Sequence, residues 1–203
     1  MSLVERAVSE IAGLLDKLYS ESMAALEAAL GFSDERGVEA VARHAREAGR
    51  LRTSLVERSV EALARYQPMA RELRRITAYM EASYDLFRVA RYALEITRVL
   101  ARVPSCSTGL GEEAETAREM LEDAYRALRR EDPVLAERVL DLDERVDRAY
   151  LRALDELAIR EGLGRCEVAR LLILRHLERI ADHAVYIASA AYFVSRGRRL
   201  LTD

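Results

Sequence analysis

Two pairs of carboxylates with the same spacing lie 97 residues apart in this chain. Glu81 and Asp85 form the first pair, and Glu178 and Asp182 form the second. Acidic side chains four residues apart lie on one face of an α-helix, where they repel each other by roughly 0.2–0.5 kcal/mol. Because both halves of a 203-residue chain carry this cost, the pattern suggests two related halves and a shared cation as the compensating partner.

A third acidic pair, Asp143 and Asp147, lies beside the apolar residues Leu142 and Val146. If its helix packs against the helix of the second pair, four carboxylates can face one another. The members of each pair are separated by about 6 Å along the helix axis. Oxygen donors at this spacing suit a hard or borderline cation, such as iron, manganese, magnesium or zinc. Without a cation, mutual repulsion would raise the carboxyl pKa values.

Ion pairs on the protein surface are the alternative explanation for these acids. With 35 acidic residues in the chain, about six acidic pairs at spacing four are expected by chance. Arg175 precedes Glu178 by three residues, and Arg145 and Arg148 surround Asp147. Each carboxylate could therefore face solvent and pair with an arginine instead of a metal.

The histidines and cysteines are expected to lie outside this chemistry. His176 and His183 could share one helix face near the acids, in a surface or outer role rather than as ligands, and His44 has no evident partner. Cys106 and Cys166 are too few for a disulfide framework and lack the spacing of zinc ligands. We therefore expect two free thiols in a reducing cytosol.

Composition limits the function further. Half of the residues are hydrophobic, a third are charged, and the net charge of −3 argues against nucleic-acid binding. We find no apolar run of the ~18 residues that cross a bilayer, no signal peptide and no glycine-rich phosphate loop. These features predict a soluble cytoplasmic protein without a transmembrane segment or an organic cofactor.

Long amphipathic helices are the elements that must position the acidic pairs. The sequence shows helical periodicity and no period-two alternation, so we expect an all-α fold. Proline, glycine and capping signals divide it into helices at about 3–30, from about 35 to 66, 69–102, 112–130, 133–160 and 165–196. Long helices with short connections pack antiparallel. The prediction is a tandem pair of three-helix bundles, residues 1–103 and 112–203, joined by a linker at 104–111.

Three segments of the chain resemble the PhoU family. The clearest is Leu171–Ala184, which reads Leu-Leu-Ile-Leu-Arg-His-Leu-Glu-Arg-Ile-Ala-Asp-His-Ala and resembles the signature of the family's last helix. Leu142–Asp147 resembles the acidic segment of the preceding helix, and Arg65–Arg74 resembles the start of the third helix. The resemblance covers essentially the whole chain, including its doubled three-helix plan.

The resemblance implies metal binding, because family members hold multinuclear clusters, often of iron or zinc, on surface acidic motifs. The implied metal ligands are Asp143, Asp147, Glu178 and Asp182 in the second half and Glu81 and Asp85 in the first. The first half departs from the pattern. The positions that match the Asp143–Asp147 pair hold Arg46 and Arg50, or Ala45 and Gly49 one residue earlier. Neither register supplies a second carboxylate pair.

The resemblance also implies a regulator rather than an enzyme. Members of the family act as negative regulators of phosphate transport and phosphate signalling. The implied partners are the ATPase subunit of a phosphate ABC transporter or a sensor kinase, with the protein expected to be a homodimer. Two alternatives stay open: a structural helical protein with surface ion pairs and no metal, and a metal-dependent hydrolase whose carboxylates activate a water molecule.

Overall fold

The fold was analysed in a computed structural model, which describes residues 2–32, 35–106, 111–159, 162 and 164–200. These residues form helices and no strand. The helices are α1 (Leu3–Leu30), α2 (Glu35–Tyr66), α3 (Ala70–Arg102), α4 (Gly111–Arg130), α5 (Pro133–Ala158) and α6 (Arg165–Arg196). Their bounds confirm the sequence prediction to within one or two residues; the expected end of the fifth helix at Arg160 lies outside the described residues.

Local capping explains where several helices begin and end. Ser2 accepts a hydrogen bond from the Glu5 backbone N–H at 3.1 Å and donates its own N–H to the Glu5 carboxylate at 2.7 Å. This capping box starts α1. Asp132 accepts from the first free N–H groups of α5, ahead of Pro133 at the first helical position. Gly197, with φ of 72°, ends α6 in the left-handed conformation that glycine adopts without strain.

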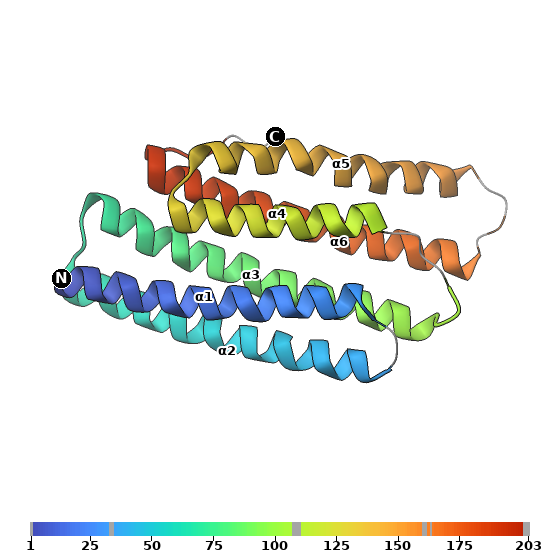
Figure 1. Cartoon of the computed structure of the whole chain (residues 1–203), viewed down its shortest axis with the longest axis horizontal. Helices are drawn as coiled ribbons and strands as arrows, with labels where there is room; N and C mark the ends of the chain where they lie inside the picture. The colour runs from blue at the N-terminus through green and yellow to red at the C-terminus, as the bar shows by residue number, and fades with distance from the viewer. Residues whose placement is uncertain (1, 33–34, 107–110, 160–161, 163, 201–203) are drawn as a thin grey trace.

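The helices form two antiparallel three-helix bundles that lie side by side (Figure 1). Helices α1, α2 and α3 make the first bundle, and α4, α5 and α6 make the second. The two bundles are joined along α3 and α6, with a smaller contact between α1 and α4. Their buried residues form one continuous apolar core, which includes Ile11, Leu55, Leu86, Leu121 and Ile173.

One prediction about the linker was wrong. Cys106 and Cys166 are not free thiols; they form a disulfide, with their Cα atoms 5.3 Å apart. The linker that leaves α3 passes the start of α6, and the neighbouring Arg165 side chain donates to the Ser105 hydroxyl at 3.3 Å. The two cysteines are 60 residues apart in sequence, so their spacing carries no signal of this contact.

In the part of the chain that the structure describes, no helix is both long and apolar enough to cross a lipid bilayer.

Candidate metal site between α5 and α6

Helical packing places four carboxylates along the seam between α5 and α6. Leu142 and Val146 of α5 are buried in the core, and Asp143 and Asp147 each follow one of them. On α6, the buried Leu177 and Ala181 are each followed by an acid in the same way. A residue one position from a core residue lies at the edge of the buried face. Both helices therefore present their acids at the rim of the core, where these side chains are partly buried.

Three of these carboxylates come together. One oxygen from each of Asp143, Asp147 and Asp182 lies within 4.8 Å of the others. Glu178 is outside this triad but contributes repulsion to Asp143. The structure thus brings three of the four predicted second-half ligands to one point and leaves the fourth next to it.

Several oxygen atoms of this group make no hydrogen bond, although Glu178 Oε2 lies 3.8 Å from Arg179 Nε. Asp143 Oδ1, Asp147 Oδ1 and Glu178 Oε2 are buried and make no hydrogen bond. Leaving a buried polar atom unpaired costs about 1–3 kcal/mol, and more when the group is charged. A cation coordinated by these oxygens would remove that cost, so the donor set fits a hard or borderline metal ion.

The pKa values of these carboxyl groups also favour a bound cation. Burial, followed by repulsion from Asp147 and Asp182, raises the pKa of Asp143 from 3.8 to about 7. Burial and the charge of Asp182 also raise the pKa of Asp147. Burial is again the main cause of the raised pKa of Glu178. Carboxylates in this arrangement hold their charge poorly without a positive partner.

Arginine side chains form ion pairs with only some of these four carboxylates. Arg175 donates to Glu178 Oε1 at 2.5 Å, and Arg179 donates to Asp182 Oδ2 at 3.2 Å. Asp143 and Asp147 make no ion pair within the described residues. The surface ion-pair alternative therefore applies to the α6 acids and does not account for the α5 acids.

The first-half pair is arranged differently. Glu81 accepts hydrogen bonds from the Arg199 guanidinium at 2.6 and 2.7 Å. Asp85 Oδ1 lies 2.8 Å from His183 Nδ1, and both side chains are about nine-tenths buried. Burial raises the pKa of Asp85, against the hydrogen bond from His183. Metal ligation by this pair stays a prediction, and in the structure these carboxylates already have cationic or hydrogen-bonding partners.

Sequence reasoning missed two histidine contacts. His183 is buried on the α3–α6 interface and packs against the rings of Tyr84, Tyr92 and Tyr186 at 5.7–6.1 Å. His44 does have a partner, because its Nδ1 lies 2.7 Å from Glu21 Oε2. Asp85 and His183 are 98 residues apart in sequence, so no local pattern could have paired them.

Comparison with known proteins identifies the family. The family model described as the PhoU domain matches this chain twice, over residues 8–100 and 110–191. The chain belongs to the PhoU family. The two matches correspond to the two bundles of the fold, and the α5–α6 acidic group lies within the second PhoU match.

Curated relatives and solved structures agree with this assignment. A PhoU homolog of the phosphate-specific transport system from Synechocystis is 33% identical over 76% of this chain and 72% of its own length. One from Pseudomonas putida is 31% identical over 91% of this chain and 75% of its own length. The crystal structure of PhoU from Pseudomonas aeruginosa superimposes with a TM-score of 0.75 at 27% identity, covering 96% of each chain. PhoU from Streptococcus pneumoniae, at 19% identity and a TM-score of 0.81, shares the fold.

Proposed function

We propose that this chain is an accessory regulator of phosphate transport that acts by protein contact and holds a metal ion between α5 and α6. The observation that supports the regulatory role is the match of both bundles to the PhoU family model. Curated relatives at 31–33% identity are named as accessory proteins of the phosphate-specific transport system. The proposed partners are the ATPase subunit of a phosphate transporter or a sensor kinase, and the proposed assembly is a homodimer in the cytoplasm.

The metal part of the proposal is supported by the unpaired oxygens of Asp143 and Asp147 and by their distance from Asp182. A cation there would neutralise the repulsion within the group and join α5 to α6. Iron or zinc are the ions that the family resemblance favours. Because the site lies at the rim of the core rather than deep inside it, a bound ion could also contact a partner protein.

Elemental analysis tests the metal proposal directly. The protein is loaded separately with iron, zinc, manganese or magnesium, and unbound ions are removed. We expect the wild type to retain iron or zinc, and the Asp143→Asn/Asp182→Asn variant to lose it. The control is Asp141→Asn/Asp155→Asn, which removes two exposed acids from α5. Equal metal content in all three proteins would end the proposal.

The regulatory role needs a separate experiment in the native host. The tagged chain is purified from cells grown at high and low phosphate, and the bound proteins are identified. We expect a transporter ATPase subunit or a sensor kinase, at a level that depends on phosphate. Unchanged phosphate uptake and unchanged phosphate-dependent expression in a deletion strain would contradict the role. Light scattering of the purified chain tests the homodimer.

A further inference from the structure

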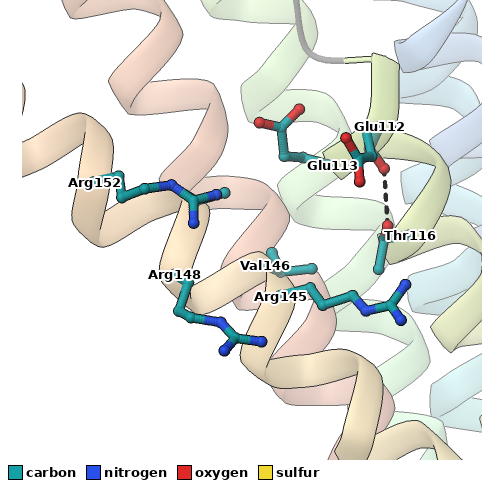
Figure 2. A pocket seen from close by; sticks show the side chains of 8 residues that line it. Glu112, Glu113, Thr116, Arg145, Val146, Arg148 and Arg152 are labelled. Atoms are coloured by element: carbon teal, nitrogen blue, oxygen red, sulfur yellow. Dashed lines mark hydrogen bonds between the residues drawn. The ribbon is translucent and has the colours of Figure 1, made fainter.

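A groove of about 300 Å³ lies between α4 and α5, and none of the four acids of the candidate metal site lines it (Figure 2). Three arginines of α5, Arg145, Arg148 and Arg152, line it. The buried side chains of Val146 and Ala149 lie between them and form its floor. The volume is at the lower end of the roughly 300–1,000 Å³ that small-molecule sites occupy.

The guanidinium groups in this groove are largely free. Within the described residues, Arg145 and Arg152 make no ion pair or hydrogen bond. Arg148 is held only along its own helix, by the Glu144 backbone oxygen at 3.0 Å and the Glu144 carboxylate at 3.7 Å. By contrast, Arg138 on the same helix pairs with two acids of α4, including Asp123 at 2.6 Å. Two of the three guanidinium groups in the groove therefore have no carboxylate partner among the described residues, and the third has one only at 3.7 Å.

The acids at the other wall do not neutralise these arginines. Glu112 and Glu113 both line the groove (Figure 2). Glu113 has Arg170 of α6 at 3.6 Å as its partner, and neither glutamate forms an ion pair with the three arginines. Both belong to the first turn of α4, where the helix dipole presents its positive end. Guanidinium groups bind phosphate oxygens through paired hydrogen bonds. The chemistry of the groove thus favours a phosphate-bearing anion.

We propose that the α4–α5 groove binds an anion that carries more than one phosphate group, such as an oligophosphate or a nucleoside triphosphate. Arg145 and Arg152 are seven residues apart, which is about 10 Å along the helix. One orthophosphate ion is small compared with the length of helix over which the three arginines are distributed. A chain of linked phosphates covers that distance.

Isothermal titration calorimetry tests this site. The full chain is treated with a chelator that is then removed, and sodium tripolyphosphate is added at constant ionic strength. We expect one binding site, weakened at least about tenfold in Arg145→Gln/Arg148→Gln/Arg152→Gln, since losing a few guanidinium–phosphate bonds exceeds the energy of one factor of ten. Orthophosphate and sulfate should bind at least about tenfold more weakly than tripolyphosphate. Binding of ATP as tight as that of tripolyphosphate assigns the ligand to nucleotides, and weaker binding of ATP assigns it to condensed phosphates.

Helix α2 offers a matched control. Arg43, Arg46 and Arg50 are exposed and have the same spacing, but Arg46 pairs with Glu39 at 2.7 Å and Arg50 with Glu47 at 3.3 Å. Their triple Gln variant should bind tripolyphosphate like the wild type. Equal weakening in the two triple variants would show attraction to general charge and overturn the proposal. Tripolyphosphate binding no tighter than sulfate binding would also overturn it.

Two further variants separate this groove from the metal site and from effects on folding. Glu112→Gln removes the one of the two lining carboxylates that has no ion-pair partner among the described residues, so we expect tripolyphosphate to bind about threefold more tightly. A folding defect cannot produce tighter binding. Asp143→Asn/Asp182→Asn should leave tripolyphosphate affinity unchanged; a loss there would place the anion at the metal site and contradict the proposal.

Discussion

The two bundles use the same helical plan but differ in how completely their acids are paired. In the first bundle, Glu81 is paired with Arg199, and Asp85 is bonded to His183 across the α3–α6 interface. In the second, Asp143 and Asp147 keep buried oxygens without partners. A disulfide also ties the linker that follows α3 to the start of α6. The contrast teaches that acids with the same spacing can be fully paired, as Glu81 and Asp85 are, or can keep buried oxygens without a hydrogen bond, as Asp143 and Asp147 do.

Removal of the disulfide should produce the largest change in stability. Because it closes a loop of 60 residues, Cys106→Ser/Cys166→Ser should lower the free energy of unfolding by about 4 kcal/mol. Urea denaturation of the wild type with and without dithiothreitol measures the effect. The reductant should bring the wild type down to the variant and leave the variant unchanged; a wild type insensitive to it would contradict the prediction.

The buried Asp85–His183 pair should have the next largest effect. Asp85→Asn removes the charge and weakens a hydrogen bond on the α3–α6 interface, which we expect to cost about 2 kcal/mol. Thermal or urea unfolding measures the loss. Asp141→Asn, an exposed acid on α5, is the control with no expected change. A loss no larger than in this control would show that the pair does not hold the bundles together.

At the acidic group of the second bundle, we expect removal of a charge to raise the stability of the fold rather than lower it. In protein freed of metal by a chelator, Asp143→Asn removes repulsion from Asp147 and Asp182 and should stabilise the fold by about 1 kcal/mol. The measurement is the unfolding midpoint of both proteins near pH 8. After metal loading, the order should reverse, because the variant loses a ligand. If the metal-free Asp143→Asn variant is less stable than the metal-free wild type, its effect has the same sign as that of Asp85→Asn, and the prediction is wrong.

The smallest effect concerns a carboxylate with two arginine partners, Glu131, in the turn between α4 and α5. Arg75 donates to it at 2.5 Å and Arg71 donates to its other oxygen at 2.5 Å. Burial opposes ionisation, but these hydrogen bonds outweigh it and lower the pKa of Glu131. The stabilisation is therefore present above the unfolded pKa of about 4.5 and is lost as the pH falls through the lower folded value.

Glu131→Gln checks this pH dependence. The variant should be less stable than the wild type at pH 7 by about 0.5–1 kcal/mol, since the arginines are partly exposed. The difference should shrink as the pH falls below 4. Unfolding at several pH values measures it, and a difference that grows on acidification would contradict the assigned sign.

Most of the fold could be predicted from local pattern. The seam of α5, with Val139, Leu142 and Val146, is buried as its spacing predicts. The Asp132–Pro133 start of α5 and the Gly197 end of α6 are capping signals that act over one turn. Such signals need no knowledge of the rest of the molecule, which is why the helix bounds were accurate.

The candidate metal site could be predicted only in part from the sequence. The four second-half acids were identified, but the sequence did not distinguish the triad of Asp143, Asp147 and Asp182 from the neighbouring Glu178. That distinction depends on how far α5 is shifted along α6. For the first half, the missing acids at Arg46 and Arg50 were visible in sequence, whereas the partners of Glu81 and Asp85 were not.

The sequence alone determined the helices, their amphipathic faces and the doubling of the three-helix unit, because these follow from periodicity and capping within a few residues. Tertiary structure decided which charged groups meet. Asp85 and His183 are 98 residues apart, and the cysteines are 60 apart. Arg145 and Arg152 form no ion pair within the described residues, although two glutamates of α4 line the same groove. Contacts of this kind depend on the relative position of packed helices, which a one-dimensional pattern does not contain.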